Sequence, residues 1–167
     1  MNTLVLERGI TIVVDGGCLN NQLPTSERHM YGSFAVFVNG KRSETVTYQN
    51  EKHASTFKWE CDDPFWLESL PDVPPSNNVA EMEMFCSAIS YLHELSDRTQ
   101  PEIVDKTKVR ILTDSALVVG YLTDSWKVKS PHLKLHVELA SKGYLKLKWM
   151  TDIRHVDNGW VKSILGH

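Results

Sequence analysis

Three carboxylates occupy similar positions in the sequence, each close to a segment with buried character. Asp15 follows an apolar run at 12–14 and precedes two glycines, Asp114 ends the run "ILTD", and Glu81 follows "SNNVA" one turn into an expected helix. Taken singly, each acid is better explained as a turn residue, a cap or a solvated charge. Carboxylates that converge repel one another unless a divalent cation neutralises them, and all-oxygen ligands favour Mg²⁺ or Mn²⁺ over zinc. The three acids together therefore indicate a metal site.

The elements expected in the first part of the chain are antiparallel strands. Residues 10–14 have the composition of a strand, and residues 31–49 predict a hairpin because β-rich arms flank Asn39-Gly40. Residues 50–75 are irregular, acidic and rich in proline and aromatic residues, with a short helix expected at 64–70. This segment is either a long covering loop or an insertion.

Helices and strands alternate in the rest of the chain. Helical spacing of apolar residues and candidate caps at 76–78 predict a helix over 76–95. Antiparallel strands followed by alternating elements predict an α/β fold, a mixed five-stranded sheet flanked by helices, in a single domain over 1–167. The remaining expected elements are strands at 108–115 and 144–153 and helices at 116–124, 130–143 (Pro131 in its first turn, Gly143 at its end) and 156–167.

Composition and cysteine content narrow the class of protein. Of the 167 residues, 41% are hydrophobic and 23% charged, as in soluble globular proteins, and no apolar stretch approaches a membrane span, so no membrane partner is expected. Cys18, Cys61 and Cys86 are odd in number and form no CxxC pair. They predict reduced thiols in a cytoplasmic protein rather than a disulfide framework or a zinc site.

The net charge of −3 conceals an uneven distribution along the chain. Residues 1–101 carry 7 Lys and Arg against 14 Asp and Glu, whereas residues 102–167 carry 11 against 7. A basic C-terminal part is suited to phosphates, while the acidic part faces solvent or a metal. Chance clustering of the charges is the alternative.

Four stretches carry a resemblance to a known family: "VVDGGCLNN", "YGSFAVFVNG", "SNNVAEMEMFCSAISYL" and "ILTDSALVVGYL". Their types and order, over most of the chain, are similar to the type 1 ribonuclease H family. The family's usual DGS is DGG here, whereas its Asn-Asn-x-x-Glu and TDS motifs are matched at 77–81 and 113–115. The resemblance implies a ribonuclease H-like fold with strand order 3-2-1-4-5 and strand 2 antiparallel. It also implies a two-metal active site that cleaves the RNA strand of an RNA–DNA hybrid.

The resemblance also assigns roles to individual residues. It implies that Asp15, Glu81 and Asp114 are catalytic ligands of two Mg²⁺ (or Mn²⁺) ions. The asparagines at 77 and 78 match positions that contact the minor groove of the hybrid, where they can read 2′-hydroxyls; helix capping is the alternative. The basic segment that grips the hybrid is reduced here, which predicts weaker and less salt-dependent binding. The implied substrate contacts are Cys18, Asn21, Ser76, Asn77, Asn78, Trp126 and Lys127, with Lys129 and Lys134 also kept in the basic segment.

The C-terminal motif departs from the family pattern. The family shows Gly-His, a loop, an Asn and a final Asp four residues later, whereas the residue four after Asn158 is Lys162. Two replacements for that ligand are open: His167, since a neutral imidazole binds divalent metals, and Asp157. We favour His167 as the only ligand-type side chain in the closing stretch "WVKSILGH", against the alternative of a frayed terminal residue. The family's mobile histidine near the leaving group has candidates in the neighbouring Arg154 and His155.

The leading hypothesis is thus a monomeric, metal-dependent endoribonuclease whose partner is an RNA–DNA hybrid. A nuclease of the same fold with another specificity, such as junction cleavage, is the first alternative, and the Asn77-Asn78 pair argues against it. A catalytically impaired nucleic-acid-binding relative is the second; the missing final Asp favours it and the three retained acids do not. An aspartic protease is excluded, because Gly16 stands where its motif has Thr or Ser and the chain holds no second copy.

Overall fold

The computed structural model describes residues 9–50, 73–98, 109–145, 147 and 151–166. Five strands form one sheet in the order β3-β2-β1-β4-β5. The β1–β2 and β2–β3 pairs are antiparallel, and the β1–β4 and β4–β5 pairs are parallel. This mixed sheet and its strand order confirm the predicted α/β fold class. The strands are β1 (Ile10–Leu19), β2 (His29–Val38), β3 (Lys41–Asn50), β4 (Val109–Thr113) and β5 (Thr151–His155).

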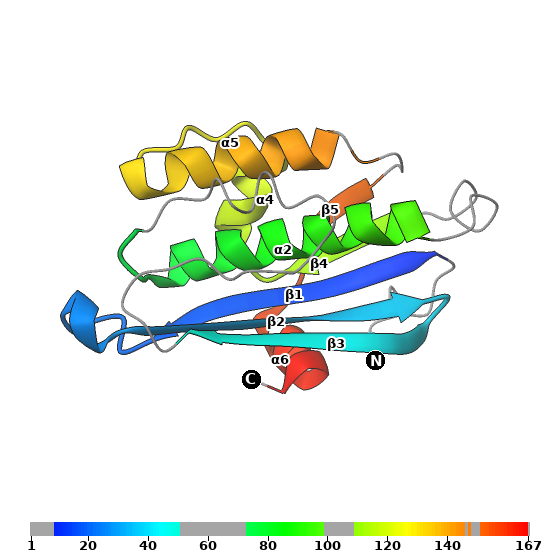
Figure 1. Ribbon diagram of the computed structural model, residues 1–167, viewed down its shortest axis with the longest axis horizontal. Coiled ribbons are helices and arrows are strands. Elements are labelled where there is room, and N and C mark those ends of the chain that lie inside the picture. The colour runs from blue at the N-terminus through cyan, green and yellow to red at the C-terminus, as the bar shows by residue number, and fades with distance from the viewer. Residues whose placement is uncertain (1–8, 51–72, 99–108, 146, 148–150, 167) are drawn as a thin grey trace.

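Helices lie on both faces of the sheet (Figure 1). Among the helices of the described residues, α2, α4 and α5 cover one face of the sheet, and α6 covers the other. Besides these helices, a short 3-10 helix η2 (Thr25–Glu27) lies in the connection between β1 and β2. The helices are α2 (Asn77–Arg98), α4 (Ala116–Thr123), α5 (Pro131–Leu145) and α6 (Asn158–Leu165).

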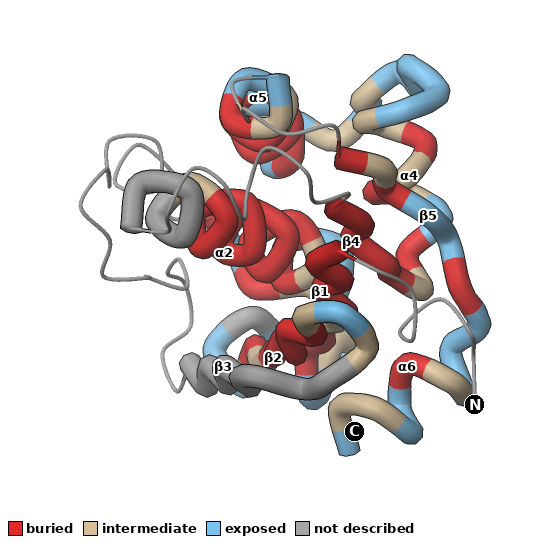
Figure 2. Tube along the Cα trace, turned by 90° about the vertical axis from the view of Figure 1, so that its right-hand side faces the viewer, coloured by how far each residue is buried: buried red, intermediate tan, exposed pale blue. Residues whose placement is uncertain are grey.

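Two apolar clusters hold these layers together, one on each face of the sheet. Side chains of a strand alternate between its faces, so Val14 faces α2 while Val13 faces α6. The larger cluster joins the sheet to α2, α4 and α5, and the smaller cluster joins it to α6 through Val161. Figure 2 shows that buried residues are concentrated along β1, β4 and α2. The predicted acids lie in β1 and α2 and directly after β4. The candidate site thus rests on the most deeply buried part of the fold.

The hairpin and the long helix form as the sequence predicts. Asn39 and Gly40 both adopt positive φ, 51° and 82°, as a two-residue turn between right-twisted strands requires. Helix α2 begins at Asn77, and Ser76 caps it, because its hydroxyl accepts a hydrogen bond from the Val79 amide at 3.2 Å. Helix α5 begins at Pro131. At the first position of a helix the backbone N–H has no partner within the helix, so proline does not remove a helical hydrogen bond there.

Three predicted boundaries are wrong. Strand β1 does not end at Val14 but continues through Asp15 to Leu19, because antiparallel pairing with β2 persists along all ten residues. Helix α5 does not stop at Gly143 and runs to Leu145, so the strand expected from residue 144 begins at Thr151. Gly143 is buried, and its carbonyl accepts a hydrogen bond from His93 Nε2 on α2 at 2.8 Å. The glycine therefore serves helix packing rather than helix termination.

Two features bear on the predicted class of protein. Residues 51–72, which include most of the acidic segment, its expected short helix at 64–70 and Cys61, lie outside the described residues. Cys18 and Cys86, which are described, are both buried free thiols. Within the part of the chain that the structure describes, no helix is long and apolar enough to cross a membrane.

Candidate metal centre

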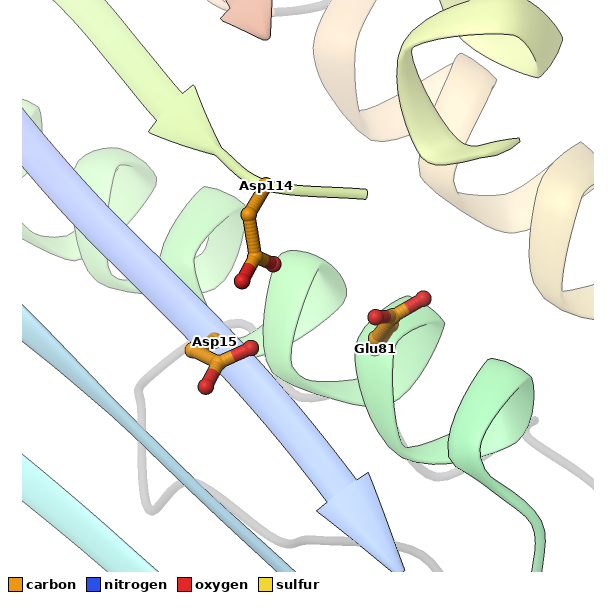
Figure 3. A group of neighbouring side chains, drawn as sticks. All are labelled: Asp15, Glu81 and Asp114. Atoms are coloured by element: carbon orange, nitrogen blue, oxygen red, sulfur yellow. The ribbon is translucent and has the colours of Figure 1, made fainter. Parts of the chain in front are cut away.

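Three carboxylates from distant parts of the sequence meet at one edge of the β1–β4 pair (Figure 3). Asp15 comes from β1, Glu81 from the second turn of α2, and Asp114 from the residue after β4. One oxygen atom of each lies within 4.8 Å of those of the other two, and all three side chains are half-buried. The predicted convergence is therefore present in the fold.

The strand register explains why Asp15 and Asp114 are neighbours. The parallel pairing of β1 with β4 ends at Val14 and Thr113, so the next residue of each strand projects where that pairing stops. Asp15 itself remains paired with Ser33 of β2, which holds its backbone in place. The site is thus built on a continuous strand, not on the strand tip that the sequence predicted, and this makes the position of Asp15 more rigid.

The glycine after Asp15 allows helix α2 to approach the strand. A Cβ atom at Gly16 would lie 2.5 Å from the Ala80 carbonyl oxygen and 2.8 Å from the Glu81 amide nitrogen, which is too close for any other residue. Because Gly16 has no side chain, the backbone of α2 packs directly against β1 at Ala80 and Glu81. A residue with a side chain at position 16 would force the two backbones apart.

Burial and mutual repulsion dominate the electrostatics of the cluster. Burial, followed by the charge of Asp114 and a hydrogen bond with it, raises the pKa of Asp15 to about 7. Burial also raises the pKa of Glu81 to about 7; a hydrogen bond from Ser115 opposes this shift, and the Asp114 charge adds to it. Without a cation, the cluster therefore retains protons near neutral pH.

The donor set fits a hard divalent cation. Three carboxylates supply only oxygen ligands, as Mg²⁺ and Mn²⁺ prefer, and one such ion would remove the repulsion that raises both pKa values. Within the described residues, the cluster includes no histidine or cysteine that would favour zinc.

Two residues that the sequence did not assign to the cluster support it. The Ser115 side chain both bonds Glu81 and caps α4, where it accepts a hydrogen bond from the Val118 amide at 3.2 Å. Asn158, the first residue of α6, donates from Nδ2 to the Asp114 carboxylate. In the sequence, Asn158 matches the asparagine of the C-terminal motif, but that match predicted no contact with the three acids.

Tyr31 on β2 is a further neighbour that the sequence did not reveal. Its ring lies over Gly17 of β1, where a Cβ atom would be 2.4 Å from the phenol oxygen. Burial, and after it the charges of Asp15, Cys18 and the other cluster acids, raises the pKa of the phenol. Gly17 therefore makes room for an aromatic hydroxyl beside the carboxylates.

The predicted groove residues form a hydrogen-bonded group between β1 and α2. Asn77 Oδ1 accepts from the Cys18 amide at 2.7 Å, and the Asn77 amide donates to Asn21 Oδ1 at 3.2 Å. Because Ser76 caps the helix, neither asparagine of the pair is needed as the cap. The Asn78 side chain is exposed, and the side-chain nitrogen of Asn77, Nδ2, has two N–H donors to offer a ligand.

The basic segment lies mostly in the connection from α4 to α5, and its last lysine, Lys134, lies in the first turn of α5. Trp126 is 50% exposed and packs across Gly120, whose carbonyl accepts from the Trp126 amide at 3.0 Å. Lys127 and Lys129 are exposed in the same connection. The packing of the indole against Gly120 holds this segment to the end of α4, and none of these residues belongs to the acidic cluster.

The C-terminal candidates differ in what the structure describes. His167 lies outside the described residues, so its role stays a prediction. Asp157 caps α6 through a hydrogen bond from the Trp160 amide to Oδ2 at 3.1 Å and is not part of the cluster. Of the two candidates for the mobile histidine, His155 Nε2 donates to the Asp114 carbonyl oxygen at 3.2 Å, while Arg154 pairs with Asp152 at 3.4 Å. His155 is therefore the better placed of the two.

Comparison with solved structures gives the fold its class. RNase H1 from Halobacterium salinarum aligns with a TM-score of 0.60 and 15% identity, covering 92% of this chain and 89% of that one. LC11-RNase H1, solved in complex with an RNA/DNA hybrid, aligns at 0.64 and 17% over 92% and 89%. The foamy viral protease-reverse transcriptase bound to dsDNA aligns at 0.56 and 14% over 92% and 84%.

These alignments define a ribonuclease H-like fold, in agreement with the topology of the sheet. The sequence matches no protein-family model, and no curated protein is significantly similar to it in sequence. The chain thus has a ribonuclease H-like fold that carries a cluster of three carboxylates, a candidate metal centre.

Proposed function

We propose that this protein is a type 1 ribonuclease H, an endoribonuclease that hydrolyses the RNA strand of RNA–DNA hybrids with two divalent metal ions. The convergence of Asp15, Glu81 and Asp114 in a ribonuclease H-like fold carries this proposal. A related structure, LC11-RNase H1, was solved with an RNA/DNA hybrid, which supports the substrate class. Cleavage of a labelled hybrid, compared with RNA and DNA duplexes, tests it. The proposal treats 1–167 as one monomeric domain in a reducing compartment such as the cytoplasm.

The carboxylates hold the reacting groups in place. Bound divalent ions would supply an activated water and neutralise the charge that develops on the leaving 3′-oxygen. Asp15 and Asp114, adjacent at the end of the β1–β4 pairing, provide one side of the ion site, and Glu81 provides the other from α2. Asn158 fixes the Asp114 carboxylate by hydrogen bonding. The hydroxyl of Ser115 does the same for Glu81. These contacts preorganise the ligands before substrate arrives.

Selection of a hybrid requires contacts to both strands. Asn77 and Asn78 lie at the start of α2, on the turn of the helix that precedes Glu81. Their amide donors can bond 2′-hydroxyls and base edges in the minor groove. A DNA strand has the base edges but no 2′-hydroxyls. Asn21, Cys18 and the Ser76 hydroxyl lie beside them through the hydrogen bonds that join β1 to α2. Ser76 is placed to help hold a phosphate of the DNA strand, and the exposed Trp126 and Lys127 supply a separate contact to the hybrid.

Replacing Asn78 with alanine should weaken hybrid binding rather than the chemical step. The loss of one or two groove hydrogen bonds should cost about 1–3 kcal/mol in the free energy of hybrid binding, because their partners on the substrate are left unpaired. Steady-state kinetics should show a raised KM with kcat little changed. Binding to a DNA duplex of the same sequence serves as the control and should not change.

Because Ser76 already caps α2, the Asn78→Ala melting temperature should stay within a degree or two of the wild type. A lowered melting temperature with unchanged hybrid kinetics would contradict the groove role and return Asn78 to helix stabilisation.

The fourth ligand is proposed to be His167. Among the described residues only three carboxylates cluster, and Asp157 has one oxygen engaged as the cap of α6. An imidazole brings no charge, so Mg²⁺ affinity should be lower than for a four-carboxylate site and Mn²⁺ should be the better activator. Activity should fall below roughly pH 6.5 as free imidazole gains a proton, unless bound metal keeps it neutral.

His167→Ala should therefore reduce activity strongly with little change in melting temperature, and His167→Asp should shift the metal preference back toward Mg²⁺. The comparison variant is Asp157→Asn. If His167→Ala retains full activity while Asp157→Asn is inactive, the ligand is Asp157 and the assignment of His167 is wrong.

A further inference from the structure

Lys162 lies on the same side of α6 as Asn158, which contacts the acidic cluster. Residues four apart on a helix share a face, so the Lys162 side chain follows the Asn158 side chain at a distance of one turn. The sheet-facing side of α6 is a different one, because Val161 is fully buried and Ile164 and Leu165 pack beside it. Asn158 donates to the Asp114 carboxylate from this shared flank. The flank that carries Lys162 is therefore the flank turned toward the metal centre.

The register of the sheet shows what lies next to this flank. Helix α6 packs over β1 and β2, above the paired residues Val13 and Ala35. Because side chains two apart in a strand share a face, the next row on this face is Asp15 paired with Ser33. From Asp114 beyond β4, α6 runs across β1 toward β2 (Figure 2). This course carries Lys162 along the row that contains Asp15.

The Lys162 ammonium is available to a ligand. Its side chain is exposed, and among the residues that the structure describes it has no ion-pair partner. A lysine is a compact, mobile point charge, suited to a phosphate oxygen. A cation that served only to neutralise the carboxylates would compete with a divalent ion at the same oxygens. An exposed cation one turn along α6 from Asn158 lies beside the cluster without occupying the carboxylate oxygens, and there it can bond a phosphate oxygen.

We propose that Lys162 binds a non-bridging oxygen of the nucleic-acid phosphate that the acidic cluster holds for cleavage. This inference rests on the proposed nuclease function and adds a substrate contact from α6 to those from β1 and α2. The contact concerns a phosphate, so it does not depend on which nucleic acid is bound.

Binding measurements on matched lysine variants test the inference. Lys162→Met removes the charge and keeps much of the apolar stem, Lys162→Arg restores a charge, and Lys142→Met removes an exposed lysine from the end of α5 as the control. Affinity for an RNA–DNA hybrid and for a DNA duplex of the same sequence is measured with Ca²⁺ at several salt concentrations. Calorimetric titration of the protein alone with Mg²⁺ gives a readout that is independent of activity.

Lys162→Met should weaken binding of the hybrid about tenfold and lower the slope of log Kd against log salt by about one. Lys162→Arg should recover most of the affinity, and Lys142→Met should match the wild type. The Mg²⁺ affinity of Lys162→Met should rise, because the variant lacks the positive charge that repels Mg²⁺ beside the cluster. Variants of Lys162 and Lys142 that behave alike would overturn the inference.

The two proposals fail differently in this experiment. If the wild type cleaves the hybrid selectively while Lys162→Met binds it normally, the nuclease function stands and the Lys162 contact is wrong. If the wild type binds hybrid and DNA duplex equally and Lys162→Met weakens both, the phosphate contact stands and the hybrid specificity is wrong. If the wild type binds neither duplex, both proposals are overturned.

Discussion

Asp114→Asn is expected to abolish turnover while leaving the fold intact. The amide keeps the shape of the side chain, and its oxygen still accepts the hydrogen bond that Asn158 donates. It removes the charge that holds the divalent ions, whose contribution to transition-state stabilisation is several kcal/mol. The rate should therefore fall roughly 1,000-fold or more. Single-turnover cleavage of a hybrid at saturating Mg²⁺ measures the loss.

Asp124→Asn is the matched control, because Asp124 is an exposed acid at the end of α4 and lies outside the cluster. Its rate and its melting temperature should equal those of the wild type. Without metal, Asp114→Asn should melt at a slightly higher temperature than the wild type, because the Asp114 charge contributes to the raised pKa of Asp15 and Glu81. Near-normal rates for Asp114→Asn would show that Asp114 is not a ligand.

The metal-free protein should lose stability as the pH rises from about 4 to about 8, and Mg²⁺ or Mn²⁺ should restore it. The pKa values of Asp15 and Glu81 are raised from 3.8 and 4.5 to about 7 in the folded protein, so over this range the folded state holds more protons than the unfolded state. The contribution of these groups is fully present below the unfolded pKa and is lost as the pH rises through about 7. A bound divalent ion replaces the protons and reverses the loss.

Urea unfolding at pH 5, 6, 7 and 8, with EDTA or with saturating Mg²⁺, measures this linkage. At a metal concentration of about 100 times Kd, binding should add about 2.7 kcal/mol to the free energy of unfolding at pH 8 and less at pH 5, where protons compete. Asp15→Asn should flatten the pH dependence and remove most of the metal effect. An equal Mg²⁺ effect in wild type and Asp15→Asn would place the ion elsewhere.

Local sequence signals were enough to predict the hairpin and the main helices. The Asn39-Gly40 turn fixes the β2–β3 hairpin because both residues accept positive φ. The apolar periodicity of α2 and the proline at the start of α5 mark those helices for equally local reasons. The strand order came from the family resemblance, and pairing in the structure confirms it.

The exact ends of β1 and α5 and the residues that support the three acids could not be predicted from the sequence, because they depend on contacts between distant segments. The continuation of β1 beyond Asp15 is set by pairing with β2, and the course of α5 through Gly143 by the contact with His93. Tyr31 and Asn158 join the centre only because β2 and α6 lie beside β1 and β4. The three acids were predicted because each lies beside a segment with buried character. Ser115, Asn158 and Tyr31, which support them, have no comparable signal in the sequence.

The most direct test of the central claim is cleavage of labelled duplexes of one sequence. RNA–DNA hybrid, RNA duplex and DNA duplex are each incubated with the protein in Mg²⁺, in Mn²⁺ and in excess EDTA. The proposal predicts cuts in the RNA strand of the hybrid alone, with either ion, and none in EDTA. Equal cutting of the DNA duplex, or activity that survives full chelation, would contradict it.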